Sequence, residues 1–214
     1  MIHVLIVDDH DLVRAGLRRI LEDSPAIKTI SEAANGEEAL QLCRSVPPDI
    51  VLLDLTLPRL SAFELTGRLQ RLHRKTRVII LAAHAKSPYP TRLLNAGAAG
   101  YLTKDCDSAE LIKAVTTVHG GRRYIGSEAA KQLALSILPG TADSPFDELS
   151  SRELEVMHKL TEGKRVPDIA TMLCLSPKTV ATYKYRIYDK LGTRSEVHLL
   201  RMVMRYGLME ASQA

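Results

Sequence analysis

The sequence predicts a chain of the α/β class, with a doubly wound parallel sheet of five strands followed by a small all-α domain of four helices. The runs near residues 3–7, 50–54 and 77–82 are apolar except at one end of each, as in strands that are covered on both faces. Stretches with helical periodicity separate these runs, which is typical of a sheet with parallel strands and crossover helices. After residue 149 only helical patterns remain, and this predicts the second domain.

The five strands are expected at residues 3–7, 29–33, 50–54, 77–82 and 98–102. The first helix is expected over residues 12–21, where apolar and small side chains recur on one face. A linker rich in turn residues begins near Gly120 and holds one short helical pattern at 128–138. We therefore divide the chain into a first domain at 1–122, a linker at 123–144 and a second domain at 145–214. The four helices of the second domain are expected at Ser151–Leu160, Val166–Leu173, Pro177–Leu191 and Ser195–Tyr206.

The composition is that of a globular protein, with 45% apolar residues among 214 and both signs of charge well mixed. The chain shows no basic leader and no run of eighteen apolar residues, so we expect a cytoplasmic protein without a membrane segment. The three cysteines, Cys43, Cys106 and Cys174, are far apart and lack the spacing of a zinc site or a disulfide framework. We expect them to be reduced, buried thiols.

The net charge of +4 is unevenly distributed along the chain. Residues 176–194 hold five Lys or Arg residues against one acid, Asp189, so this short segment carries a local excess equal to that of the whole chain. A localised positive segment is typical of a binding site for a polyanion such as nucleic acid.

Acidic residues stand where two of the buried strands end. Asp8 and Asp9 follow the first strand, and Asp54 ends the third. Taken singly, a strand-end Asp is more often a solvated loop residue or a helix N-cap. Ligands of doubly wound sheets, however, bind at the carboxyl ends of the strands, and Lys104 follows the fifth strand at the same edge. Carboxylates suit Mg²⁺, and a carboxylate beside Mg²⁺ and an ammonium can accept a phosphoryl group.

Three motifs resemble the receiver domain of two-component response regulators, which has a flavodoxin-like fold. They are VDDH at residues 7–10, Asp54 followed by Pro58, and GAAGYLTK at residues 97–104. The resemblance implies Mg²⁺ as cofactor and a sensor histidine kinase as phosphoryl donor. It also assigns roles: the metal ligands would be Asp8, Asp9, Asp54 and the backbone carbonyl of Thr56, the phosphoacceptor would be Asp54, and the clamp on the phosphoryl group would be Lys104.

The sequence departs from this family at two places. Relatives end the fourth strand with Thr or Ser, whose hydroxyl moves to the phosphoryl group and lets an aromatic residue on strand five turn inward. Here the two switch positions hold Ala82 and Tyr101. The missing hydrogen bond, worth roughly 1.5 to 3 kcal/mol, would weaken the bias toward the active state by about ten- to a hundredfold. The second departure is PRLSA at residues 58–62, where relatives usually have a glycine-rich loop.

Two alternatives follow from Ala82. In one, Ala82 is a small core residue, and the hydroxyl of Thr56 or Thr103 makes the contact instead. In the other, the protein is an atypical regulator that binds DNA independently of phosphorylation. An enzyme with Asp54 as nucleophile, such as a phosphatase of the haloacid dehalogenase type, is not expected, because such enzymes need a second carboxylate where Thr56 stands.

The stretch LSPKTVATYKYRIYDKL, residues 175–191, predicts a helix with two distinct faces. Ser176 is a good N-cap and Pro177 suits the first turn. Val180, Ile187 and Leu191 share one side with the stem of Lys184, and the opposite side is polar. Three of the seven tyrosines lie in this stretch, and cations beside aromatic side chains suit contact with phosphates and base edges.

Together with the helix before it and the turn at residues 174–176, this stretch resembles the LuxR-type helix-turn-helix domain of the NarL/FixJ class, closest to the GacA/UvrY type. The resemblance implies that the protein binds double-stranded promoter DNA, regulates transcription and is a homodimer when active. By position, bases would face Ala181, Thr182 and Tyr185, and phosphates would be held by Ser176, Lys178, Thr179, Lys184 and Arg186. Relatives often carry Lys or Asn where Ala181 stands, so sequence preference is expected to differ. The helix at Ser195–Tyr206 is either a dimer seam or part of the domain's own core.

Overall fold

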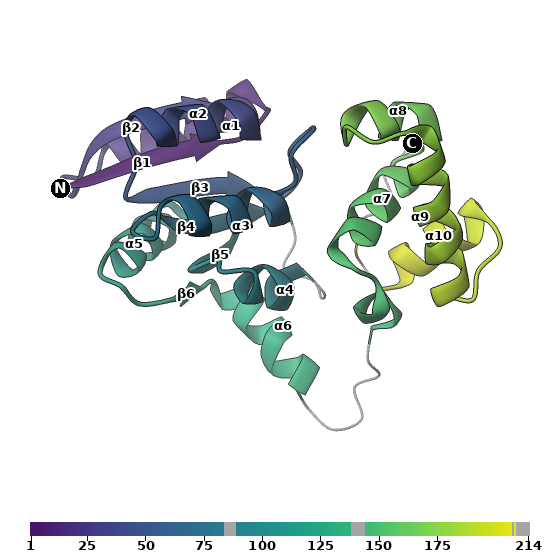
Figure 1. The fold of residues 1–214 in the computed structure, drawn as a ribbon. Coiled ribbons are helices and arrows are strands. Elements are labelled where there is room, and N and C mark those ends of the chain that lie inside the picture. The colour runs from purple at the N-terminus through teal and green to yellow at the C-terminus, as the bar shows by residue number, and fades with distance from the viewer. Residues whose placement is uncertain (84–88, 138–143, 207, 209–214) are drawn as a thin grey trace. The chain divides into compact units, whose positions relative to one another are not determined.

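The computed structural model of the chain describes residues 1–83, 89–137, 144–206 and 208. The chain forms two compact units that divide between Ala134 and Leu135. The N-terminal unit contains a sheet covered by helices, and the C-terminal unit is helical (Figure 1).

The N-terminal unit contains the predicted doubly wound parallel sheet, with strand order β2-β1-β3-β4-β5-β6. All five pairings between neighbouring strands are parallel. The strands are β1 (Ile2–Val7), β2 (Ile27–Ala33), β3 (Ile50–Asp54), β4 (Arg77–Ala82), β5 (Gly100–Thr103) and β6 (Tyr124–Ile125). The predicted α/β fold class is therefore confirmed.

Helices cover both faces of this sheet. Its central strands β1, β3 and β4 are therefore buried almost throughout. One apolar cluster joins the sheet to α2 (Gly36–Ser45), α3 (Ala62–Leu72) and α4 (Tyr89–Asn95). A second cluster, on the other face, joins it to α1 (Asp11–Glu22) and α5 (Ser108–His119). Side-chain N-caps start several of these helices; for example, Asn35, Ser61 and Asp107 each accept a hydrogen bond from a backbone N–H three residues on.

The prediction of five strands was wrong by one. The sixth strand, β6, pairs Tyr124 with Gly100 and Ile125 with Tyr101. It lies in the stretch that we expected to be a linker, and α6 (Ser127–Ile137) follows it directly. Ile125 packs on one apolar cluster and Tyr124 on the other, so burial of these two side chains holds the strand against the sheet edge. A strand of two residues is too short to give an alternating pattern in the sequence.

The C-terminal unit contains the four predicted helices, with ends within two residues of those expected. A short 3₁₀ turn at Pro145–Glu148 precedes α7 (Ser151–Thr161), α8 (Val166–Met172), α9 (Pro177–Lys190) and α10 (Glu196–Arg205). Helix α10 has two faces: Leu199 and Val203 are buried in the unit's own core, whereas Val197 is 62% exposed and Met204 is 36% exposed. The helix therefore packs on its own domain and also leaves an apolar face uncovered.

The three cysteines are free thiols, but they are not all buried as we expected. Cys43 is buried, and burial raises the pKa of its thiol to about 11. Cys106 is half-buried, and Cys174 is exposed. Cys174 lies in the turn between α8 and α9, with a φ of 53°, and is outside the core. Within the described ranges, no helix is both long enough and apolar enough to cross a membrane.

Candidate functional site

The carboxyl ends of β1 and β3 bring two acidic side chains together. The two strands are paired neighbours in the sheet and run in the same direction (Figure 1). Asp54 is the last residue of β3, and Asp8 follows β1 directly. Both side chains are almost fully buried, with only 1% of each residue exposed. Burial of two adjacent carboxylates is unfavourable unless a cation or hydrogen-bond donors compensate their charge.

Lys104 supplies that compensation. Its Nζ lies 2.7 Å from Oδ2 of Asp8 and 2.9 Å from Oδ1 of Asp54. Position 104 follows β5, and its backbone N–H donates to the carbonyl of Ala82 at 2.8 Å, which fixes the lysine at this edge of the sheet. One ammonium thus serves two buried carboxylates, and the pocket keeps an excess of negative charge.

The pKa shifts of these groups follow from that imbalance. Burial raises the pKa of Asp54 above its ordinary value, although the charge and hydrogen bond of Lys104 oppose this effect. For Lys104, burial alone would lower the pKa, but the hydrogen bonds and charges of Asp8 and Asp54 outweigh it and raise the pKa. The pocket therefore favours a positive charge and resists a further negative one.

The second oxygen of Asp54 is bound by Thr56. The Thr56 hydroxyl donates to Oδ2 of Asp54 at 2.9 Å. Thr103, the other hydroxyl that we considered, makes no hydrogen bond with Asp54 among the described residues. Thr56 is therefore the hydroxyl within reach of Asp54, while its backbone carbonyl remains the expected metal ligand.

Asp9 and His10 lie at the mouth of the same pocket. The Nδ1 atom of His10 is 2.9 Å from Oδ1 of Asp9 and 3.3 Å from Oδ1 of Asp8. One potential ligand atom from each of Asp8, Asp9, His10 and Asp54 lies within 4.8 Å of the other three. The structure thus brings together all three predicted carboxylates. It adds His10, which we did not single out as a ligand, although the VDDH motif contains it.

The two predicted switch positions are both buried away from solvent. Ala82 ends β4, Tyr101 is in β5, and both are fully buried in the same apolar cluster. Burial raises the pKa of the Tyr101 phenol, and the charges of Tyr89 and Asp54 act in the same direction. The aromatic side chain is therefore directed inward in this structure.

Helix α9 has the two faces that its sequence predicts. Val180 and Ile187 are fully buried against the rest of the unit, whereas Lys178, Thr182 and Tyr185 are exposed, Tyr185 at 72%. Ser176 caps the helix: its hydroxyl oxygen accepts the N–H of Thr179 at 3.1 Å. The hydroxyls of Thr179 and Ser176 share a hydrogen bond of 2.8 Å. The hydroxyl of Thr182 donates to the Lys178 carbonyl at 2.9 Å.

Lys184 differs from Lys178 and Arg186, the other two cations that we expect to hold phosphates. Its ammonium pairs with Glu196 at the start of α10, and it lies 5.6 Å from the centre of the Tyr188 ring. Hydrogen bonding to Glu196 raises the pKa of Lys184. Lys178 and Arg186 are exposed and have no ion pair within the described part of the chain. The charge of Lys184 is thus already neutralised by a neighbour in the absence of DNA.

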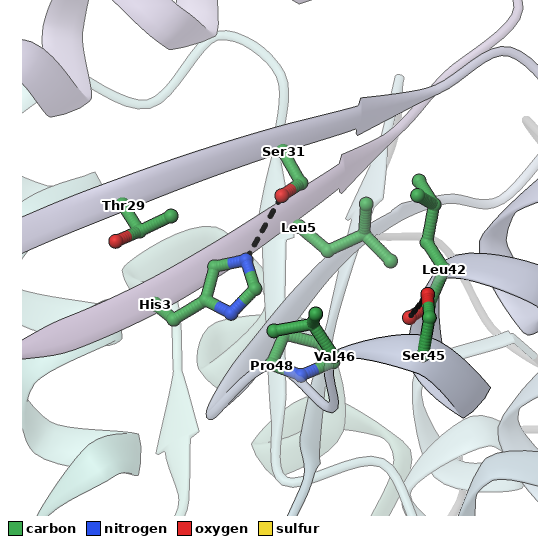
Figure 2. A pocket seen from close by; sticks show the side chains of 8 residues that line it. All are labelled: His3, Leu5, Thr29, Ser31, Leu42, Ser45, Val46 and Pro48. Carbon is green, nitrogen blue, oxygen red and sulfur yellow. Dashed lines mark hydrogen bonds between the residues drawn. The ribbon is translucent and has the colours of Figure 1, made fainter.

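A separate hollow lies at the opposite ends of β1 and β2, beside the end of α2 (Figure 2). It measures about 230 Å³ and is lined by His3, Leu5, Thr29, Ser31, Leu42, Ser45, Val46 and Pro48. In it the Nε2 atom of His3 shares a hydrogen bond of 2.9 Å with the Ser31 hydroxyl (Figure 2). The lining contains no carboxylate or ammonium, and it includes none of the predicted site residues.

Comparison with known proteins identifies both units. Residues 4–116 match the family described as "Response regulator receiver domain", and this match covers more than half of the chain. The chain belongs to the response regulator family. Residues 147–203 of this response regulator match a second family, "Bacterial regulatory proteins, luxR family". The protein is therefore a response regulator with a receiver domain and a LuxR-type DNA-binding domain.

Relatives extend over nearly the whole response regulator. It is 45% identical to response regulator UvrY of Escherichia coli strain K12 over 212 residues, which are 99% of this chain and 97% of that protein. It is also 45% identical to response regulator GacA of Pseudomonas viridiflava over 213 residues, or 99% of this chain and 100% of that one. The crystal structure of response regulator ChrA, from a heme-sensing two-component system, has a TM-score of 0.55 and 31% identity and covers 97% of this chain and 98% of its own. The predicted resemblance to the GacA/UvrY type is confirmed.

Receiver domains generally bind Mg²⁺ in an acidic pocket, and the donor set of this response regulator fits that ion. Asp8, Asp9 and Asp54 offer carboxylate oxygens within 4.8 Å of one another, and the buried pair carries more negative charge than Lys104 neutralises. The oxygen ligands and the uncompensated negative charge of this set therefore suit a hard dication.

The loop at residues 58–62, where we expected relatives to have glycine, contains a residue with a positive φ. Arg59 has a φ of 66°, in the left-handed region that side chains other than glycine adopt at a cost. The N–H of Leu60 donates to the Pro58 carbonyl at 2.8 Å, which closes a tight turn around Arg59. The backbone at Arg59 therefore adopts a conformation that suits glycine, although the loop contains none.

Proposed function

We propose that this response regulator accepts a phosphoryl group on Asp54 from a sensor histidine kinase and, as a homodimer, binds promoter DNA to regulate transcription. The observation that supports it best is the contact of Lys104 with both buried carboxylates, at 2.7 Å to Asp8 and 2.9 Å to Asp54. This arrangement places an ammonium beside a buried nucleophile at the carboxyl edge of a parallel sheet, where doubly wound folds bind their ligands.

In the proposed reaction, a carboxylate oxygen of Asp54 attacks the phosphorus atom of the donor, and the bond between phosphorus and the donor's leaving atom breaks. Lys104 then contacts the phosphoryl oxygens and partly neutralises their charge. Mg²⁺, held by Asp8, Asp9, Asp54 and the Thr56 carbonyl, would supply the remaining neutralisation. Turnover of phosphomonoesters is not expected, because Thr56 stands where a phosphatase of this kind needs a second carboxylate.

Ala82 and Tyr101 are the proposed switch positions between the site and its output. Position 82 carries no hydroxyl, and the Thr56 hydroxyl is the group that already binds Asp54, at 2.9 Å. We therefore assign to Thr56 the contact that Thr or Ser at position 82 makes in relatives. Tyr101 would respond to the change at Asp54 from its buried position on β5, which pairs with β4, the strand of Ala82.

For the DNA complex, we propose that α9 enters the major groove with its exposed face. Bases would meet Ala181, Thr182 and Tyr185. Phosphates would be held by Ser176, Lys178, Thr179, Lys184 and Arg186. The exposed apolar face of α10, with Val197 and Met204, supports its use as the dimer seam. A two-fold dimer of this kind reads half-sites about one DNA turn, roughly 34–36 Å, apart.

The phosphorylation step is tested with acetyl phosphate and Mg²⁺. We expect the natural protein to gain the mass of one phosphoryl group, and Asp54→Ala to gain none, because Asp8, the other acid beside Lys104, is a proposed metal ligand and not the phosphoacceptor. Beryllofluoride, a phosphoryl mimic, should raise the DNA affinity of the natural protein and not that of Asp54→Ala. An equal mass gain on both proteins, or an equal DNA response, would contradict the proposed function.

The proposed DNA interface gives a second prediction, on Glu196→Gln. Removing this carboxylate frees Lys184 for a DNA phosphate, so DNA binding should tighten about twofold to fivefold at low salt, the usual worth of one exposed ion pair. The slope of the logarithm of affinity against the logarithm of salt concentration should steepen by at most about 0.9, the value for one full phosphate contact, because Glu196 competes with the phosphate for Lys184 in the natural complex. Binding isotherms at several salt concentrations measure both.

Two controls separate this contact from the general effect of a lost negative charge. Glu162→Gln removes the same charge just after α7, where the carboxylate pairs with Lys159 and His158 rather than with a residue of α9, and should not change the slope. In a Lys184→Met background, Glu196→Gln should have no effect on affinity. If the substitution tightens binding equally with and without Lys184, the ion pair does not mask the lysine.

A further inference from the structure

We propose that His10 is an additional metal ligand, through which the acidic pocket also binds a first-row transition-metal dication such as Ni²⁺ in place of Mg²⁺. The inference rests on the proposed function in that it uses the same pocket. It goes beyond that function because the carboxylate set alone does not include a nitrogen ligand.

The backbone holds His10 over the pocket. Its N–H donates to Oδ1 of Asp8 at 2.9 Å, and the residue is the N-cap of α1, in an extended conformation with a φ of −96°. This hydrogen bond fixes the backbone of residue 10 beside the buried Asp8 carboxylate. This places the imidazole, which itself is 66% exposed, at the open side of the pocket.

The distances among the donor atoms suit one ion. Nδ1 of His10 lies 2.9 Å from Oδ1 of Asp9 and 3.3 Å from Oδ1 of Asp8. Neighbouring ligands of an octahedral ion with bonds of about 2.1 Å are separated by about 3 Å, so these spacings match the edge of such a coordination sphere. A neutral imidazole with its proton on Nε2 would present the lone pair of Nδ1 to such an ion.

The mixed donor set selects among dications. Mg²⁺ prefers oxygen ligands and keeps several waters, so the imidazole adds little to its binding. Transition-metal dications bind imidazole well, and their affinity for sites with nitrogen and oxygen ligands rises along the series from Mn²⁺ to Cu²⁺. Because the four donor atoms lie within 4.8 Å of one another, the pocket holds one ion at a time. A transition metal and Mg²⁺ must therefore compete for it.

Calorimetric titration of the full chain with Ni²⁺ and with Mg²⁺ tests this inference. His10→Asn should weaken the Mg²⁺-displaceable Ni²⁺ site by about tenfold or more, since even outer-shell partners of metal ligands are worth that much. Its effect on Mg²⁺ affinity should be less than about twofold. The matched control, His119→Asn, removes an exposed histidine at the end of α5 and should leave this Ni²⁺ site unchanged.

A further variant separates this inference from the proposed function. Asp54→Asn should weaken both Ni²⁺ and Mg²⁺, because it removes a shared carboxylate. If Mg²⁺ binding depends on Asp54 while the competing Ni²⁺ site is the same in His10→Asn and the natural protein, His10 is not a ligand and the proposed function stands. If Asp54→Asn changes neither metal, the pocket is not a metal site and both proposals fail.

Discussion

Replacing Lys190 with Met is expected to destabilise the C-terminal unit by about 2 kcal/mol. Its Nζ lies 2.7 Å from Oε2 of Glu153 and 3.0 Å from the Glu148 carbonyl, and so ties the end of α9 to the start of α7. The Glu153 side chain is 4% exposed, so removing the ammonium leaves a buried carboxylate without its cation. Such a loss costs about 3 to 5 kcal/mol in a fully buried pair. The Lys190 side chain is 36% exposed, and solvent screens part of that cost.

This effect should depend on pH in a defined direction. Burial by itself would raise the pKa of Glu153, but hydrogen bonds from Lys190 and Ser150 outweigh it, and the pKa is lowered. A depressed carboxyl pKa contributes stability that is present above the unfolded value and is lost as the pH falls through the folded value. The difference between the natural protein and Lys190→Met should therefore be largest near neutral pH and shrink in acid.

Hydrogen exchange of α7 and α9 peptides in the full chain measures the loss of stability near neutral pH. Urea unfolding followed by circular dichroism measures how this loss of stability depends on pH. Lys178→Met is the matched control, because it removes the same charge from an exposed position on the same helix. We expect that control to exchange like the natural protein. Equal exchange in the two variants would show that the buried pair does not stabilise the unit. DNA binding should fall with Lys190→Met because α9 is the proposed recognition helix.

Much of the fold and of the acidic pocket could be predicted because the signals are local or follow from strand direction. The two faces of α9 were predicted from a period of 3.6 residues, and Val180 and Ile187 are indeed buried. The convergence of Asp8 and Asp54 was predicted because the carboxyl ends of parallel strands meet at one edge, and β1 and β3 prove to be neighbours. No knowledge of side-chain packing was needed for either prediction.

What could not be predicted depends on contacts between distant or very short elements. Lys184 lies on the expected helix, but its partner Glu196 belongs to the next helix, and only the packing of α9 and α10 brings the two together. Strand β6 has two residues and gives no pattern. The contact of Thr56 with Asp54, rather than one from Thr103, depends on the rotamer of a loop side chain. His10 stood in the motif, but a histidine beside acids does not reveal where its ring points.

The acidic pocket provides the other large effect: Asp54→Asn should stabilise the unphosphorylated N-terminal unit by about 1 to 3 kcal/mol in the absence of Mg²⁺. Two carboxylates with only 1% of each residue exposed share the single ammonium of Lys104, so one negative charge is poorly compensated. The substitution removes that excess and keeps an amide oxygen for the Thr56 hydroxyl. Lys104→Met should act in the opposite direction, by about 3 kcal/mol, because both carboxylates then lose their cation.

The effect of Asp54→Asn on stability should have the opposite sign to that of Lys190→Met, although both effects should shrink in acid. Burial raises the pKa of Asp54, so the folded state binds the proton more tightly than the unfolded state does. The destabilisation is fully present above the folded pKa and disappears as the pH falls below the unfolded value. The stabilising effect of Asp54→Asn should therefore be largest near neutral pH and vanish in acid, whereas the natural protein gains relative stability there.

Thermal unfolding across pH, with and without Mg²⁺, tests this interpretation of the pocket. Mg²⁺ should raise the unfolding temperature of the natural protein more than that of Asp54→Asn, because the ion replaces the missing positive charge. Glu64→Gln, on the exposed surface of α3 and paired with Arg68, is a control that should respond to Mg²⁺ like the natural protein. If Asp54→Asn is less stable than the natural protein at neutral pH, then Lys104 already balances the pocket. In that case the excess of negative charge, which favours both the dication and the transfer of a phosphoryl group in its company, does not exist.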